Sequence, residues 1–141
     1  MNNSNIKILI AEDDALMVKI LEFILRKEGY EVASCKDGLT AIEMIPVFVP
    51  DLIITDIVMP YRSGLEIINH SKENFKNIPV IVVSSLGEEE STVIKAFNLG
   101  ADDFVSKPFN PNELLVRIKR LCSKSRHSVK SKDSLTIILS A

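Results

Sequence analysis

The chain has 141 residues, of which 46% are hydrophobic and 26% charged, and its net charge is -2. These values are typical of one globular domain with room for a short appendage. The small negative charge favours neither nucleic acid nor an anionic membrane as a partner. No apolar run approaches the ~20 residues of a membrane span, and residues 1–5 lack the apolar core of a secretion signal. We therefore expect a soluble, cytoplasmic protein.

The first half of the chain alternates apolar runs with helical patterns. Strands are predicted over Ile6–Ala11, Tyr30–Ser34 and Leu52–Thr55. Helices are predicted over Leu16–Lys27, Gly38–Ile45 and Leu65–Phe75. Asp14 is placed to cap the first helix and Gly29 to close it. Ile20 is expected on the buried face of that helix, and Pro46 is expected to end the second helix.

The second half continues the same alternation. A fourth strand, Val80–Val83, runs into Ser84-Ser85, and a fifth covers Asp103–Ser106. The helix between them is expected to start at Glu88–Glu90, to close at Gly100 and to bury Ile94 and Phe97. Asn110 and Pro111 start a last helix that runs to about Cys122. Five successive strand–helix units predict an α/β fold: a parallel sheet with helices on both faces.

Polar residues follow four of the predicted strands where each ends. They are Glu12 and Asp13 after the first strand, Asp56 after the third, Ser84 after the fourth and Lys107 after the fifth. The carboxyl ends of parallel strands share one edge, where such sheets bind their ligands. Taken alone, Asp56 could equally cap the turn that follows it. The other three strand ends favour a common site.

The chemistry of this set indicates a cation and a phosphoryl group. Three neighbouring carboxylates raise one another's pKa unless a cation neutralises them. Oxygen ligands without a nearby histidine or cysteine suit Mg²⁺. A lysine and a hydroxyl beside that cation complete a phosphoryl-binding set, and an aspartate can act as nucleophile and form an acyl phosphate.

Several spaced motifs carry a resemblance to a known family. The motifs are Ile8–Asp14, Pro50–Asp56 with Met59-Pro60 and Gly64, Pro79–Ser85, and Gly100–Phe104 with Lys107–Phe109. From Ile6 to about Ser123 the chain resembles a response regulator receiver domain, the phospho-acceptor of two-component signalling. The resemblance implies a flavodoxin-like (βα)5 fold with strand order 2-1-3-4-5. It also implies a regulatory domain that catalyses only its own phosphorylation and dephosphorylation, and is not otherwise an enzyme.

The resemblance assigns a role to each residue of the set. Asp56 is the phosphorylated acid, and Lys107, with an expected cis bond to Pro108, contacts the phosphoryl group. The implied Mg²⁺ ligands are Asp13 directly, Glu12 through water, the Asp56 carboxylate and the Val58 carbonyl. Ser84 is the switch hydroxyl and Phe104 the switch aromatic. Asp14 and Asp51 are interpreted as a helix cap and a turn before a strand.

The implied partners are a sensor histidine kinase or a phosphotransfer protein. The surface of the fourth helix, fifth strand and fifth helix, including Asp102 and Arg117, is the expected surface for a homodimer or a downstream partner. No direct nucleic-acid contact is expected from this chain. Two other classes of protein are the alternatives. A flavodoxin-like flavin or nucleotide binder would need a Gly/Ser/Thr-rich loop where this chain has three acids. A degenerate receiver is disfavoured because every key position is filled.

Residues 1–124 are assigned to the receiver domain and residues 125–141 to a linker and tail. The stretch Asp133–Thr136 resembles the Asp-x-Leu-Thr that opens diguanylate cyclase domains, so the tail could begin a truncated output domain. The alternative is that Leu135–Leu139 forms a short strand that packs on a neighbour or on its own domain.

Overall fold

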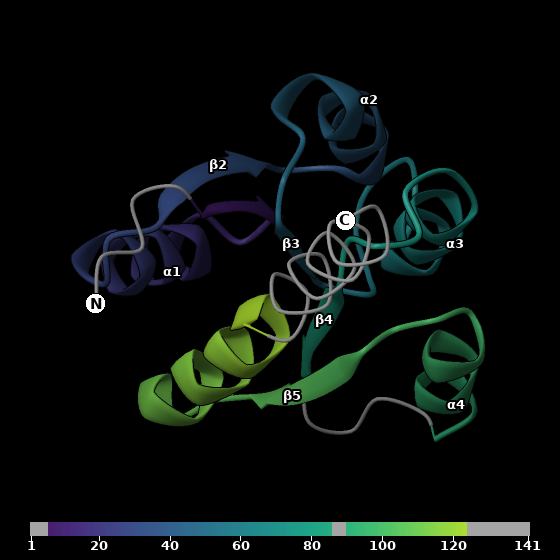
Figure 1. The fold of residues 1–141 in the computed structure, drawn as a ribbon. Helices are drawn as coiled ribbons and strands as arrows, with labels where there is room; N and C mark the ends of the chain where they lie inside the picture. Colours follow the sequence, from purple (N-terminus) through teal and green to yellow (C-terminus); the bar gives the residue numbers. More distant parts are fainter. Residues whose placement is uncertain (1–5, 86–89, 124–141) are drawn as a thin grey trace, which may run out of the picture.

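Strands and helices alternate along the whole described chain (Figure 1). The computed structural model describes residues 6–85 and 90–123, so the predicted tail at 125–141 lies outside the described residues. The strands are β1 (Lys7–Ala11), β2 (Glu31–Cys35), β3 (Leu52–Thr55), β4 (Val80–Ser85) and β5 (Asp103–Lys107). The helices are α1 (Ala15–Lys27), α2 (Gly38–Phe48), α3 (Gly64–Asn74), α4 (Glu90–Asn98) and a helix over residues 111–123, here called helix 111–123.

The five strands form one parallel sheet in the order β2-β1-β3-β4-β5. The predicted fold class and strand order are therefore confirmed. In register, Ala11 of β1 lies between Cys35 of β2 and Thr55 of β3, while Ser85 of β4 lies opposite Lys107 of β5. The carboxyl ends of the strands thus meet at one edge of the sheet.

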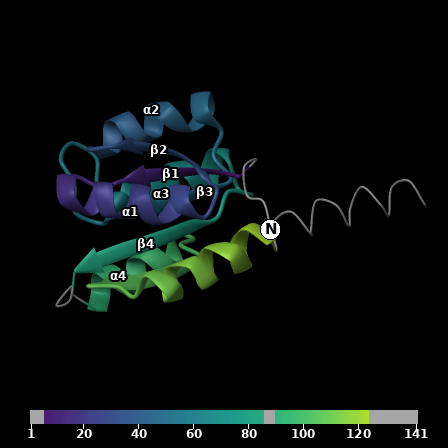
Figure 2. The same ribbon diagram turned by 90° about the vertical axis from the view of Figure 1, so that its left-hand side faces the viewer.

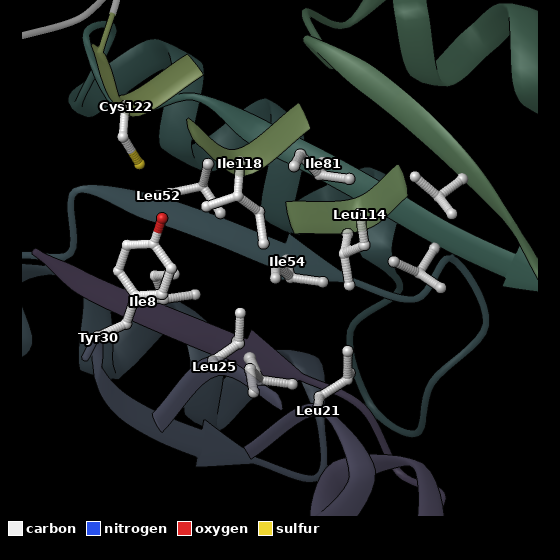
Figure 3. Close-up of a cluster of buried hydrophobic side chains, with 13 residues drawn as sticks. Ile8, Leu21, Leu25, Tyr30, Leu52, Ile54, Ile81, Leu114, Ile118 and Cys122 are labelled. Atoms are coloured by element: carbon white, nitrogen blue, oxygen red, sulfur yellow. The ribbon is translucent and has the colours of Figure 1, made fainter. Parts of the chain in front are cut away.

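Each face of the sheet is covered by its own helices (Figures 1 and 2). Alternate residues of β1 point to opposite faces, as the two-residue period of a strand requires. Ile8 and Ile10 belong to a core with α1 and helix 111–123, which Figure 3 shows in close-up. Leu9 and Ala11 belong to a second core with α2, α3 and α4. Within residues 6–85 and 90–123, none of the helices has the length and apolar character that crossing a bilayer requires.

The ends of α1 follow the sequence prediction. The Asp14 carboxylate accepts hydrogen bonds from the backbone N–H groups of Leu16 at 3.0 Å and Met17 at 3.2 Å, which is the N-cap arrangement. Gly29, just past the helix, has φ of 94°, a conformation that glycine adopts without steric cost. Asp14 is therefore confirmed as a structural cap.

Three residues predicted to face inward are exposed instead. Ile20 is 40% exposed on α1, and Ile94 and Phe97 are 51% and 44% exposed on α4. The buried residues are Val18, Leu21 and Leu25 on α1 and Ala96 on α4. The prediction for these faces was wrong because apolar residues cover more than one side of each helix, and periodicity alone cannot choose among them.

Pro46 does not end α2, which continues to Phe48. A proline inside a helix removes one hydrogen bond, to the carbonyl four residues earlier. Here that loss falls in the final turn, where the Val49 N–H still donates to the Ile45 carbonyl at 2.9 Å. Phe48 packs against the second core and the Lys7 ammonium lies 5.4 Å from its ring centroid. These contacts hold the last turn in place.

Val49 ends α2 in the left-handed region, with φ of 50°, although its side chain is β-branched. The side chain is also 57% exposed, so it gains little from packing. Such a conformation costs about 1–2 kcal/mol for a residue with a Cβ. We expect Val49→Gly to raise the free energy of unfolding by about 1 kcal/mol, measured by urea denaturation. The control is Val47→Gly, at an exposed position inside the helix, which should lower it by about 0.5 kcal/mol. A loss of stability in Val49→Gly would contradict the assignment of strain.

Candidate functional site

Backbone hydrogen bonds place the acids at the carboxyl edge of the sheet. The Glu12 N–H donates to the Cys35 carbonyl and the Asp56 N–H to the Ala11 carbonyl, each at 3.0 Å. These bonds continue the parallel ladders one residue beyond the strands. The backbone that carries both side chains is therefore hydrogen-bonded in the same way as the strands of the sheet.

Glu12, Asp13 and Asp56 form one cluster. Each contributes a carboxylate oxygen, and these oxygens lie within 4.8 Å of one another. Glu12 is buried, Asp56 is half-buried and Asp13 is exposed. The cluster thus opens to solvent on the Asp13 side, and a small cation could enter from there.

Lys107, the last residue of β5, reaches across the edge to the cluster. Its Nζ donates to Glu12 Oε1 at 2.5 Å and to Asp56 Oδ2 at 3.0 Å. Sequence reasoning placed Lys107 at this edge but did not anticipate its ion pair with Glu12. No spacing rule could have shown it, because the two residues lie 95 positions apart in the sequence and meet only through the strand order.

Burial and pairing shift the pKa values of this ion pair. Burial raises the pKa of Glu12 above its usual value, and the hydrogen bonds from Lys107 and from the Asp14 N–H offset this only in part. Burial acts to lower the pKa of Lys107, but its hydrogen bonds to Glu12 and Asp56 outweigh burial and raise it. Lys107 therefore stays a cation.

The Asp56 carboxylate is held by both of its oxygens. Oδ1 accepts the Ile57 N–H at 2.7 Å and the Val58 N–H at 3.4 Å, while Oδ2 accepts from Lys107. Val58 belongs to the loop just after Asp56, and its side chain is 65% exposed. Val58 is two residues beyond Asp56, so its backbone carbonyl belongs to the same loop.

The donor set fits Mg²⁺. Oxygens on opposite sides of an octahedral Mg²⁺ are about 4.2 Å apart, which is compatible with the spread of the three carboxylate oxygens. The ligands are hard and anionic, and one lysine cannot neutralise three carboxylates. A divalent cation would offset the remaining charge.

Ser84 and Phe104 lie on the two strands next to this cluster. Ser84 is fully buried near the end of β4, two residues beyond Val82, which pairs with Thr55 just before Asp56. Phe104 is half-buried on β5, and its ring centroid lies 6.5 Å from that of Phe97 on α4. Phe104 thus contacts α4 through Phe97.

Asp51, interpreted from the sequence as a turn residue, lies away from the acidic cluster. Asp51 Oδ2 accepts the Lys7 N–H at 2.8 Å at the opposite end of β3, so it ties two strands together. His70 is half-buried on α3 beside Asn74, and His127 lies outside the described residues. The peptide bond between Lys107 and Pro108 is cis, as predicted.

The raised pKa of Glu12 predicts a pH-dependent stability difference. The folded protein holds this proton more tightly than the unfolded chain, so the contribution of Glu12 is fully present below about pH 4.5. It is lost as the pH rises through the raised folded-state pKa. In Mg²⁺-free buffer we expect Glu12→Gln to be more stable than the wild type at pH 7, and this gain should shrink towards pH 4.5. Urea midpoints measure it.

The control for this prediction is Glu73→Gln, which removes an exposed carboxylate from α3. It should change stability little at either pH. A wild type more stable than Glu12→Gln at pH 7 would show that the Lys107 pair outweighs the burial of Glu12.

Comparison with known proteins agrees with the fold. A sequence model described as the response regulator receiver domain matches residues 8–119. The receiver domain of the Francisella response regulator 1452 is 29% identical, with a TM-score of 0.78 over 86% of this chain and 99% of that one. The signal receiver domain of a signal transduction histidine kinase from Syntrophus aciditrophicus is 33% identical, with a TM-score of 0.78 over 84% and 90%.

A third similar structure, NtrX from Brucella abortus, is 27% identical, with a TM-score of 0.83 over 90% of this chain but only 29% of that longer one. Receiver domains are regulatory phospho-acceptors that bind Mg²⁺ in an acidic pocket and interact with histidine kinases or phosphotransfer proteins. The family model covers most of the chain, including Glu12, Asp13 and Asp56 of the cluster. The chain therefore belongs to the response regulator receiver domain family.

Proposed function

We propose that this chain is a signalling switch that accepts a phosphoryl group on Asp56 from a histidine kinase or phosphotransfer protein in a Mg²⁺-dependent reaction. The observation that carries the proposal is the Asp56 carboxylate, which is bound by Lys107 and clustered with Glu12 and Asp13. This set combines a nucleophile, a fixed cation and ligands for a second cation.

The reaction follows from these groups. An Asp56 carboxylate oxygen forms a bond to phosphorus as the bond from phosphorus to the donor histidine nitrogen breaks, and the leaving imidazole keeps the electron pair. When bound by Asp13, Glu12, Asp56 and the Val58 carbonyl, Mg²⁺ would neutralise charge on the phosphoryl oxygens. Lys107 offers a positive charge to the same group and the Ser84 hydroxyl a hydrogen bond. The product is an acyl phosphate on Asp56.

The charge of the loop after β1 argues against the flavin- or nucleotide-binding alternative. That loop carries Glu12, Asp13 and Asp14, and these carboxylates would repel a phosphate unless a cation stood between them. We therefore propose a phospho-acceptor that catalyses only its own phosphorylation and dephosphorylation.

The phospho-acceptor is tested with a small phosphodonor such as acetyl phosphate, with the adduct followed by mass spectrometry. We expect one added phosphoryl group with Mg²⁺ and essentially none in EDTA, because the carboxylates then repel the incoming dianion. Asp56→Asn should abolish the adduct. Asp51→Asn, at the other end of β3, should leave it unchanged. An adduct that survives in Asp56→Asn would refute the assignment.

We further propose that phosphorylation changes partner affinity through the face of α4, β5 and helix 111–123. Ile94 and Phe97 of α4 and Val116 of helix 111–123 are exposed apolar residues on these elements. The contact between Phe97 and Phe104 offers a route from the site to this face. If Ser84 moves towards the phosphoryl group, Phe104 can follow it and shift a two-state equilibrium at α4.

The charged residues predicted on this face, Asp102 and Arg117, are already paired within the chain. The Asp102 carboxylate accepts from Lys72 Nζ at 2.8 Å, and Arg117 Nη1 donates to both Asp103 carboxylate oxygens, at 2.7 and 2.8 Å. Arg117 also donates to Glu113. Asp102 and Arg117 were predicted to belong to a partner surface. Their intramolecular pairs leave the exposed apolar residues as the stronger basis for association.

This surface is tested by adding beryllofluoride, a phosphoryl mimic, and measuring the mass of the particle by sedimentation. We expect a homodimer or an altered set of amide chemical shifts on α4, β5 and helix 111–123. Ile94→Asp should prevent the change but still permit phosphorylation at Asp56. Val47→Asp, an equally apolar exposed position on α2, should have no effect. If beryllofluoride alters neither the mass nor those shifts, the proposed face is wrong.

A further inference from the structure

The loop between β3 and α3 carries both Asp56 and Val58, so its position decides where two proposed Mg²⁺ ligands lie. Its first turn is closed by α3, because the Gly64 N–H donates to the Ile57 carbonyl at 2.7 Å. A Cβ on Gly64 would lie 2.0 Å from the Asp56 carbonyl oxygen, so only glycine permits this approach. The Asp56 end of the loop is thus held by α3.

The other part of the loop is held by a different element, α2. The Pro60 carbonyl accepts two backbone hydrogen bonds, from the Arg62 N–H at 2.9 Å and from the Gly38 N–H at 3.3 Å. The first closes a γ-turn around Tyr61, whose φ is 68° although it is not glycine. The second joins that turn to Gly38, the first residue of α2.

Gly38 leaves no room for a side chain at this joint. An ideal Cβ at position 38 would lie 1.7 Å from the Arg62 carbonyl oxygen and 2.4 Å from its carbonyl carbon. Cβ atoms essentially never approach other heavy atoms closer than 3.0 Å. Any other residue at this position must therefore separate α2 and the loop by more than an ångström.

The loop is the partner that would give way. Further along α2, Ala41 and Ile45 are fully buried in the second core, which fixes the helix on the sheet. By contrast, Val58 and Tyr61 of the loop are 65% and 85% exposed. Met59 packs against the second core, whereas Pro60 and Tyr61 are exposed, so the turn is the part of the loop that can shift. Val58 is only two residues from Pro60.

We propose that Gly38 is a positioning residue for the Mg²⁺ site: it lets the γ-turn at Tyr61 dock on α2 and so fixes the part of the loop that follows the Val58 carbonyl. The inference rests on the proposed Mg²⁺ site. Mg²⁺ tolerates little deviation from octahedral geometry, and residues that orient metal ligands typically change affinity about 10- to 100-fold when they are replaced.

The test is a Mg²⁺ titration of the full chain followed by backbone amide chemical shifts, with thermal unfolding recorded for each variant. Gly38→Ala should weaken Mg²⁺ binding about tenfold or more. Its matched control is Gly100→Ala, which also replaces a constrained glycine, with φ of 115° and Lys72 beside it. Gly100 precedes β5 and so lies at the opposite edge of the sheet. This control should lose stability but keep the wild-type affinity.

A second pair of variants disturbs the same joint from the loop side and leaves α2 untouched, so it decides the question if Gly38→Ala does not fold. Tyr61→Pro fixes φ near −65°, so it cannot adopt the positive φ that this γ-turn has at position 61. Tyr61→Gly adopts positive φ freely. We expect weakened Mg²⁺ binding in Tyr61→Pro and wild-type binding in Tyr61→Gly.

The outcomes separate this inference from the function on which it rests. If the wild type itself shows no Mg²⁺-dependent shifts around Asp56, the proposed function fails, and the inference fails with it. If the wild type binds Mg²⁺ and both Tyr61→Pro and folded Gly38→Ala bind it equally well, the inference alone is overturned. An equal loss of affinity in Gly38→Ala and Gly100→Ala would also overturn it, since general destabilisation would then explain both.

Discussion

The ion pair from Lys107 to Glu12 and Asp56 is the interaction on which the carboxyl edge of this sheet depends. Ionised carboxylates are costly to bury unless they are paired, and Glu12 is only 2% exposed. Lys107 supplies the compensating charge from β5, across the ends of β3 and β4. The pair forms only when the strands are assembled in this order. The assembled sheet therefore holds negative charge at its edge, ready to bind a cation.

The two hydrophobic cores hold the strands that end at this edge in fixed positions. β1 and β3 are buried on both faces, so neither strand can slide without disrupting packing with helices on either side. Glu12 and Asp56 directly follow these strands, so the same packing fixes the position of their backbone. The loops beyond them are less constrained, and close backbone contacts at Gly38 and Gly64 take over the role that packing has in the strands.

The buried faces of the helices could not be predicted from the sequence pattern alone. Ile20, Ile94 and Phe97 follow helical spacing, but α1 and α4 are apolar on more than one side. Which side is buried depended on the position of the helix against the sheet. Pro46 is a similar case, because the packing of Phe48 and the capping bond at Val49 compensate for the hydrogen bond that proline removes. In each case a local preference gave way to a tertiary contact.

By itself the sequence determined the alternation of strands and helices, the parallel sheet and the identity of the polar residues at its edge. These features depend on local periodicity and on where each apolar run stops. Both can be read from a short stretch of sequence without knowing the rest of the fold. The cap at Asp14 and the position of Asp56 directly after a strand were predictable for the same reason. Only the tertiary structure decided that Lys107 pairs with Glu12, that Arg117 pairs with Asp103, and that Gly38 touches the loop of Asp56. These contacts join residues on different elements, so they depend on angles and separations that arise only when the whole sheet and its helices pack together.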